Sequence, residues 1–266
     1  MFFRRKRNKS LILGHTQNLC IMKLYISLLF IVQLFSTVVF CQQDNDYRDL
    51  LILYADGDYS NCLKKAKKYM KKSKCANDEF PYLVSSAAYF SISKDQLYDL
   101  DYPNAYYYAV EFAGVAYQKM KETSSYVDFK NSFLPDLVMS AIEDARYAMI
   151  DADSTTLKEV IIRMDQLNQF NPVDPGFLLI KSAYQNHLKD SVGANETYKK
   201  GMALMNGLSS TKNMPETGRV SLKLGLLLCA DYYAWNRPEK ARSILIEGKF
   251  LFAGDEEYEY ALNNLN

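Results

Sequence analysis

Few residues in this 266-residue chain have the types and spacing needed for catalysis or metal binding. Beyond the first 41 residues there is one histidine, His187, which excludes multi-histidine metal sites. The cysteines in the same part, Cys62, Cys75 and Cys229, have no CxxC spacing. No glycine-rich phosphate loop is present. We therefore expect no metal, no cofactor and no catalytic residue, and we predict that the chain is not an enzyme.

Neighbouring carboxylates are the remaining groups that could do acid-base chemistry. They occur as the pairs Glu143/Asp144, Asp151/Asp153 and Glu256/Glu257. Because carboxylates on helix surfaces are usually solvated, we interpret these pairs as exposed helix faces and a solvated C-terminal turn. They give no reason to expect hydrolysis or proton transfer.

The first 41 residues have the composition of an export signal. They hold six basic and no acidic residues, and an uncharged, mostly apolar run extends from Leu24 to Phe40. This pattern is typical of a secretory signal peptide, so we expect translation to start at Met22 and cleavage to occur before Gln42. Lipidation of Cys41 and a retained membrane anchor are the alternatives. The predicted product is periplasmic or envelope-associated, with one domain over residues 42–266.

Seven lysines lie between Lys64 and Lys74 and raise the question of nucleic-acid binding. On one helix they occupy a continuous half of the cylinder, and the apolar residues from Cys62 to Met70 occupy the other half. A nucleic-acid surface would also place aromatic residues among the basic ones, but Tyr69 lies on the apolar side. Residues 42–266 hold 26 basic and 31 acidic residues, a poor balance for binding phosphate backbones. We predict a solvated helix face and no nucleic-acid partner; an anionic-lipid or other anion-binding patch is the alternative.

A recurring corner pattern indicates the architecture. Gly57-Asp58-Tyr59 joins two stretches of helical apolar periodicity, and a small residue, Cys62, follows three positions later, with Ala66 one turn further on. The pattern resembles the tetratricopeptide repeat (TPR), in which two antiparallel helices meet at such a corner and a small residue lets them approach. Equivalent anchor positions are Ala105, Val160, Ala194 and Ala241.

The resemblance implies an all-α protein built as a right-handed α-solenoid of antiparallel helix pairs, with about ten helices. Residues 93–101, 121–132 and 206–216 are predicted to be loops, because their composition is polar or rich in turn-forming residues. The Lys-, Tyr- and Asn-rich body resembles that of exported proteins of Bacteroidetes.

The same resemblance implies a binding groove lined by the first helix of each pair. Alignment on the corners places Tyr54 and Tyr233 in this groove, with Tyr89, Gln185 and Asn186 beside them. The chain has 21 tyrosines, and tyrosine suits a binding surface because it combines apolar area with one hydrogen-bonding tip. The alternative is that most of these tyrosines fill gaps between helices.

Three consecutive tyrosines, Tyr106 to Tyr108, span too much of a helix for all to be buried. We expect at least one of them to be exposed or to lie in an interface. The predicted function is that of a noncatalytic exported scaffold that binds a protein or peptide partner of the cell envelope in a TPR-like groove. The alternative is a glycan-associated surface accessory protein whose exposed tyrosines stack on sugar rings.

Overall fold

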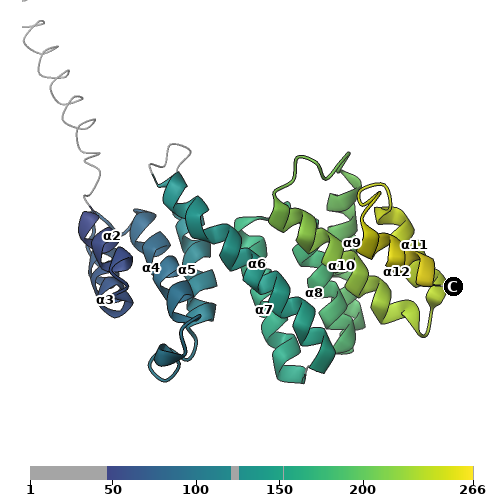
Figure 1. Cartoon of the computed structure of the whole chain (residues 1–266), viewed down its shortest axis with the longest axis horizontal. Helices are drawn as coiled ribbons and strands as arrows, with labels where there is room; N and C mark the ends of the chain where they lie inside the picture. Colours follow the sequence, from purple (N-terminus) through teal and green to yellow (C-terminus); the bar gives the residue numbers. More distant parts are fainter. Residues whose placement is uncertain (1–46, 121–125, 152, 266) are drawn as a thin grey trace, which may run out of the picture. The chain divides into compact units, whose positions relative to one another are not determined.

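The computed structural model describes residues 47–120, 126–151 and 153–265, and all regular secondary structure in these residues is helical. The described part contains eleven α-helices, one short 3-10 helix and no strand (Figure 1), which confirms an all-α protein. The helices are α2 (Arg48–Ala55), α3 (Tyr59–Met70), α4 (Phe80–Ile92), η1 (Gln96–Tyr98), α5 (Ala105–Lys119), α6 (Val127–Asp151), α7 (Ser154–Phe170), α8 (Pro175–His187), α9 (Ser191–Asn206), α10 (Glu216–Ala234), α11 (Pro238–Gly248) and α12 (Glu256–Asn264).

The expected leader, with Met22, the run from Leu24 to Phe40 and Cys41, lies outside the described residues. Within the described ranges, every helix is too short or too polar to span a bilayer.

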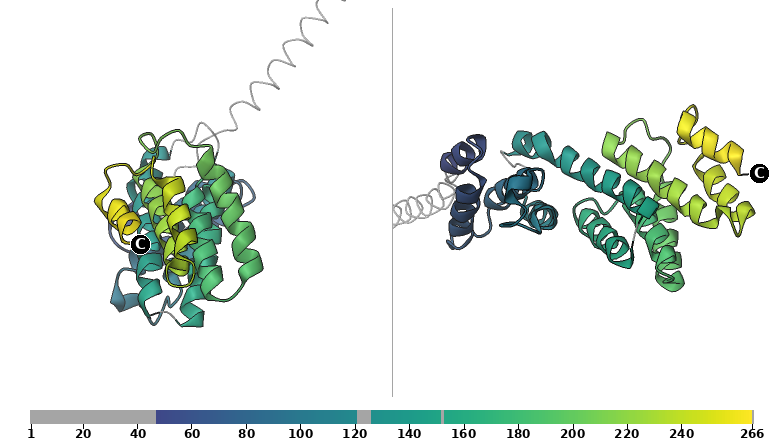
Figure 2. Two further views of the ribbon diagram at one scale, coloured as in Figure 1. Left: turned by 90° about the vertical axis from the view of Figure 1, so that its right-hand side faces the viewer. Right: turned by 60° about the horizontal axis from the view of Figure 1, so that its bottom comes forward.

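Helices that follow one another along the chain pack together in space. Contacts join α2 with α3, α4 with α5, α6 with α7, α8 with α9 and α10 with α11. Further contacts join each of these pairs to the next, among them α3 with α4, α5 with α7 and α8 with α10 (Figure 2). The core is therefore built mainly from sequence neighbours.

The first predicted corner has the local geometry that its residues require. Gly57 has φ +74, a left-handed conformation that glycine adopts without steric cost. Asp58 then caps α3, and its side chain accepts a hydrogen bond from the backbone N–H of Asn61. Cys62 is fully buried, and its thiol donates to the Leu50 carbonyl of α2 at 3.6 Å. The small residue lies at the close helix crossing, as predicted.

The other anchor residues are also buried: Ala105, Val160, Ala194 and Ala241. At two crossings a serine of the first helix reaches the second. Ser86 donates to the Ala109 carbonyl at 2.7 Å, and Ser182 donates to the Ala194 carbonyl at 2.8 Å. A serine hydroxyl can reach a backbone carbonyl of the next helix only where small side chains let the two helices approach, which explains the alanines at these crossings.

The lysine-rich helix is shorter than its charge pattern predicts. α3 ends at Met70, so the last three lysines of the run lie in the turns that follow the helix. The lysines are nevertheless on the outside, and Lys65 forms an ion pair with Asp49 at 2.7 Å. The prediction of a solvated face is confirmed, and the prediction of one helix through Lys74 is wrong.

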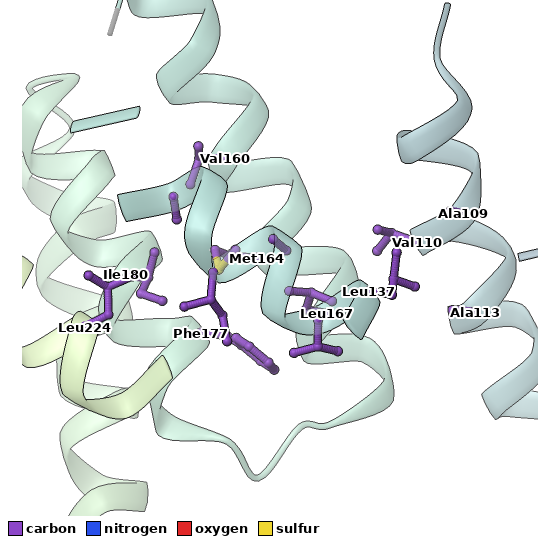
Figure 3. Packing of buried hydrophobic residues seen from close by; sticks show 14 of the residues in the cluster. Ala109, Val110, Ala113, Leu137, Val160, Met164, Leu167, Phe177, Ile180 and Leu224 are labelled. Atoms are coloured by element: carbon purple, nitrogen blue, oxygen red, sulfur yellow. The ribbon is translucent and has the colours of Figure 1, made fainter. Parts of the chain in front are cut away.

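Side chains from five helices meet in one stretch of the core. Val110 of α5, Leu137 of α6, Met164 of α7, Phe177 of α8 and Leu224 of α10 are all buried, and Figure 3 shows them with their neighbours. Burial of each such side chain contributes about 1.5–3 kcal/mol. This packing fixes how α5, α6 and α7 lie against one another, and these are the helices that carry the surface described below.

α8 and α10 approach each other especially closely. A Cβ atom built on Gly225 of α10 would lie 2.6 Å from the Cβ of Leu179 and 3.0 Å from the carbonyl oxygen of Gly176. Next to this contact, the Ser221 hydroxyl donates to the buried carboxylate of Asp174 at 3.0 Å. Any side chain larger than hydrogen at position 225 would therefore push the two helices apart.

Two expectations about helix boundaries are wrong. Residues 121–132 were expected to form a loop, but α6 begins at Val127 because Phe129 packs on Tyr54 of α2 and Phe80 of α4. The expected C-terminal turn is instead the first turn of α12, which brings the number of described helices to eleven. The loop predicted over residues 206–216 is confirmed, since α9 ends at Asn206 and α10 begins at Glu216.

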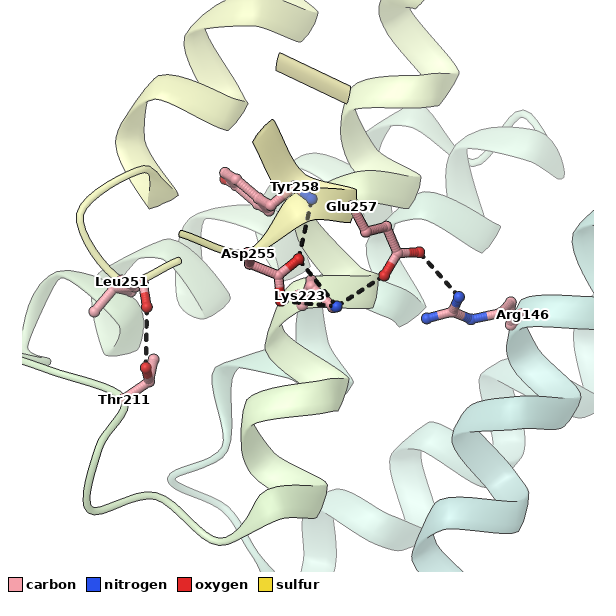
Figure 4. A network of polar contacts seen from close by, with 7 residues as sticks. All are labelled: Arg146, Thr211, Lys223, Leu251, Asp255, Glu257 and Tyr258. Carbon is pink, nitrogen blue, oxygen red and sulfur yellow. Dashed lines mark hydrogen bonds and ion pairs between the residues drawn. The ribbon is translucent and has the colours of Figure 1, made fainter. Parts of the chain in front are cut away.

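A polar network holds α12 against α10 and α6. Lys223 forms ion pairs with Asp255 at 3.0 Å and with Glu257 at 2.8 Å, and Glu257 also pairs with Arg146 at 3.0 Å. Figure 4 shows these contacts together with the Asp255 side chain accepting the backbone N–H of Tyr258. The carboxylates of Asp255 and Glu257 therefore hold α12 against α10 and α6.

Candidate interaction surface

Among the described residues, no group of three or more His, Cys, Asp or Glu side chains is placed to hold a metal ion. The three cysteines are buried, and burial raises the pKa of Cys62 to about 11 and that of Cys229 to about 12. Thiols with such pKa values are protonated near neutral pH and make poor nucleophiles. Neither a metal centre nor a reactive thiol is therefore indicated among the described residues.

The carboxylates singled out from the sequence have structural contacts. Asp144 pairs with Arg163 at 2.9 Å. Asp153 caps α7 by accepting the backbone N–H groups of Thr155 and Thr156, and Glu257 belongs to the network of Figure 4. None of these three approaches a histidine or another carboxylate in a way that would share a proton.

The predicted groove residues Tyr54 and Tyr89 are half-buried between helices. The Tyr54 ring lies 5.7 Å from that of Tyr59 and 5.5 Å from that of Phe129. The Tyr89 ring stacks on Phe112 at 5.7 Å and lies 5.3 Å from Tyr108. Each fills space between aromatic neighbours, and Tyr89 also borders the surface described below.

The other three predicted residues lie on α8 and α10. Asn186 is only 8% exposed, so little of its amide is available to a partner. The Gln185 amide donates to Asp190 at 3.2 Å. Tyr233 is half-buried beneath Lys240, whose Nζ lies 3.7 Å from the ring centroid. The five predicted residues are thus spread over four helices, and no one hollow joins them all.

Exposed tyrosines gather on α5 and α6, beside α7. Tyr107 and Tyr108 are 43% and 39% exposed, and Tyr147 of α6 is 68% exposed. The surface comprises Tyr106, Tyr107, Tyr108, Tyr147, Ile162 and Arg163, and is called the tyrosine surface from here on. The expectation that at least one of the three consecutive tyrosines is exposed is confirmed.

The tyrosine surface contains two hollows. One, of about 380 Å³, is lined by Pro103, Asn104, Tyr106, Tyr107, Tyr108, Glu159, Ile162 and Arg163. The other, of about 360 Å³, is lined by Asp144, Tyr147, Ala148, Thr156, Glu159, Val160 and Arg163. Because Glu159 and Arg163 line both, the two hollows lie on either side of one turn of α7.

Arg163 is held rigidly between these hollows. Its guanidinium lies 2.9 Å from Asp144 and 3.7 Å from Glu159, and its central carbon is 5.0 Å from the ring centroid of Tyr106. The Tyr106 hydroxyl donates to the Leu137 carbonyl at 3.0 Å, which fixes the ring. Burial raises the pKa of Tyr106, so its hydroxyl stays protonated as a donor. Burial raises the pKa of Asp144, and the charge of Arg163 opposes this effect.

A second hollow region lies near the C-terminus, between α10, α11 and α12. It measures about 350 Å³, and most of its lining is apolar, with Leu224, Leu228, Leu245 and Leu265 among its residues. Trp235, which follows α10, is 92% exposed. This C-terminal groove is another candidate site for a partner.

Sequence reasoning found part of the tyrosine surface and missed the rest. The run of three tyrosines was a usable signal. Tyr147, Ile162 and Arg163 were missed because their place beside that run depends on how α6 and α7 pack against α5, which no local pattern encodes.

The chain matches no protein-family model, no curated protein and no solved structure among those with which it was compared. Its function has to be inferred from its own residues.

Proposed function

We propose that this chain is a noncatalytic exported scaffold that binds a protein or peptide partner of the cell envelope. The tyrosine surface carries this proposal. Rigid, half-exposed tyrosines around shallow hollows are typical of protein-binding surfaces, because they offer a large contact area and lose little entropy on binding. Tyr106 is held in place by Arg163 and by the Leu137 carbonyl, so it forms a rigid base for this surface.

The proposed architecture is a TPR-like, right-handed α-solenoid in which successive antiparallel pairs stack. Support comes from the glycine corner at Gly57, from the buried small anchor residues and from contacts that join each pair mainly to its neighbours. In such an array the chain presents an extended surface, which suits a scaffold better than an enclosed active site.

Export is proposed from the apolar run that precedes Gln42. Mass spectrometry of protein from the native host is expected to find an N-terminus at Gln42. A soluble product that retains Met1 or Met22 would refute this part of the proposal.

The binding test compares capture of envelope proteins by the wild-type chain and by the double variant Tyr107→Ala/Tyr108→Ala. Truncation of two such residues is expected to weaken binding by about 1–2 kcal/mol each. The matched control is Tyr260→Ala on α12, since Tyr260 is also exposed, at 73%, but lines neither hollow of the tyrosine surface. Circular dichroism checks that all variants keep their helices.

Other outcomes would redirect the proposal. Loss of capture with Trp235→Ala, together with full capture by the tyrosine variant, would move the binding site to the surface around Trp235, at the end of α10. Tyrosine-dependent binding to a glycan array without protein capture would favour the glycan-associated alternative, in which the rings stack on sugars.

A further inference from the structure

The tyrosine surface carries more negative than positive charge. Arg163 is the only basic residue among the described residues that line its two hollows, and it is shared by two carboxylates, Asp144 and Glu159. Both carboxylates keep much of their surface in water, with side chains 48% and 57% exposed. One guanidinium therefore leaves a net negative charge at the rim of the hollows.

Further acidic side chains lie close to this rim. Glu143 is next to Asp144 on α6 and is exposed, and Glu111 lies one turn beyond Tyr107 and Tyr108 on α5. Lys158, next to Glu159 on α7, offsets one of these charges and leaves the balance negative. The partner that best matches this surface is positively charged, because a like-charged partner would be repelled.

The protein's own Arg163 shows what this surface can bind. The guanidinium lies against the ring of Tyr106 while its nitrogen atoms pair with Asp144. An aromatic face beside a carboxylate is the arrangement that recognises a cationic side chain, through cation–π attraction and a charged hydrogen bond. Tyr107, Tyr108 and Glu159 line one hollow together and supply these two features again. Glu159 contacts Arg163 only at 3.7 Å and its side chain is 57% exposed, so its carboxylate can accept a second cation.

We propose that the tyrosine surface binds a basic segment of its protein partner. A lysine or arginine of that segment lies against Tyr107 or Tyr108 and pairs with Glu159, while apolar residues beside it cover Ile162, which is 48% exposed. This inference rests on the proposed function and adds the chemistry of the partner to it.

The probe is a random peptide library displayed on phage and selected on the purified chain. Selected peptides are tested as synthetic peptides against the wild type and against Tyr107→Ala/Tyr108→Ala, to retain those that depend on the tyrosine surface. These peptides are expected to be enriched in lysine or arginine next to apolar residues. Replacing that basic residue by glutamine is expected to weaken binding at least fivefold.

A charge variant of the protein tests the same contact from the other side. Glu159→Gln is expected to weaken the retained peptides about threefold to tenfold and to reduce the salt dependence of their affinity. The Glu159 side chain is 57% exposed, and its contact with Arg163 is long, at 3.7 Å, so the variant is expected to keep the fold. The matched control is Glu196→Gln on α9, an exposed carboxylate outside both hollows, which should leave affinity unchanged.

The outcomes separate the two proposals. If no selected peptide depends on Tyr107 and Tyr108, the proposed function fails and the inference fails with it. If peptides depend on the tyrosines but carry no basic residue, or bind Glu159→Gln as tightly as wild type, only the basic partner is refuted. Tyrosine-dependent self-association in sedimentation would assign the surface to a second copy of the chain and would also refute the basic partner.

Discussion

Two of the aspartates that cap helices in this protein, one buried and one exposed, have pKa values shifted in opposite directions. Asp174 at the start of α8 is 3% exposed, and it accepts hydrogen bonds from the Gly176 backbone N–H at 2.8 Å and from the Ser221 hydroxyl at 3.0 Å. Burial raises its pKa from 3.8 to about 6, although these hydrogen bonds work in the other direction. Asp153 at the start of α7 is exposed, and hydrogen bonds from Thr156 lower its pKa.

The sign of the pH effect follows from these directions. For Asp174 the folded pKa lies above the unfolded one, so its contribution to the free energy of unfolding is largest below pH 4 and is lost as the pH rises to about 6. The difference between 3.8 and about 6 corresponds to about 3 kcal/mol. Asp174→Asn keeps a capping oxygen but cannot ionise. Its stability relative to wild type is therefore expected to rise by up to about 3 kcal/mol between pH 4 and pH 7.

The assay is urea unfolding of both proteins at half-unit steps from pH 4 to pH 7.5, followed by circular dichroism. Asp153→Asn is the matched control at an exposed cap. Because the folded pKa of Asp153 is lowered, its stabilising contribution is present above the unfolded pKa of 3.8 and is lost as the pH falls below it. Between pH 4 and pH 7.5, Asp153→Asn should therefore keep a nearly constant stability relative to wild type, whereas Asp174→Asn should gain stability relative to wild type as the pH rises. Parallel pH profiles for Asp174→Asn and wild type would refute the reasoning about the buried cap.

Other substitutions test the packing. Cys62→Phe should overpack the α2–α3 crossing and cost about 1–3 kcal/mol in denaturant melts, whereas Lys67→Glu should change stability by less than about 0.5 kcal/mol; equal losses would mean that α3 is rotated. Gly225→Ala should destabilise by about 1–3 kcal/mol despite the better helix propensity of alanine, and a stabilised variant would contradict the close α8–α10 approach. Glu257→Gln should loosen α12 and speed amide exchange in residues 256–264 more at low than at high salt; unchanged exchange would mean that apolar contacts alone hold that helix.

Local patterns predicted the helical pairs because each pattern reports a local requirement. The Gly57 corner demands a residue that tolerates positive φ, and Cys62 and Ala105 mark crossings where only small side chains fit. The repeat pattern therefore predicted about ten helices, close to the eleven of the described residues. α12 escaped notice because it buries only Tyr258 and Leu262 among its nine residues, too few for a recognisable apolar stripe.

The candidate site was predicted less well because a surface is made by packing between helices. Tyr54 and Tyr89 were expected in a groove, yet aromatic neighbours from other helices cover much of each ring. The three consecutive tyrosines could be recognised from helix geometry alone. The position of Arg163 beside Tyr106 could not be predicted, since the two lie on helices separated by the whole of α6.

The ion pair between Arg146 and Glu257 also bears on the order in which this protein is assembled. Most helices contact helices close to them in the chain, so each pair can form soon after its second member has been synthesised. The Arg146–Glu257 contact instead joins residues 111 positions apart. It has to wait until the final helix has been made, and until then Arg146 and Lys223 both lack their Glu257 partner. Synthesis of α12 therefore completes a connection to α6, which was made much earlier.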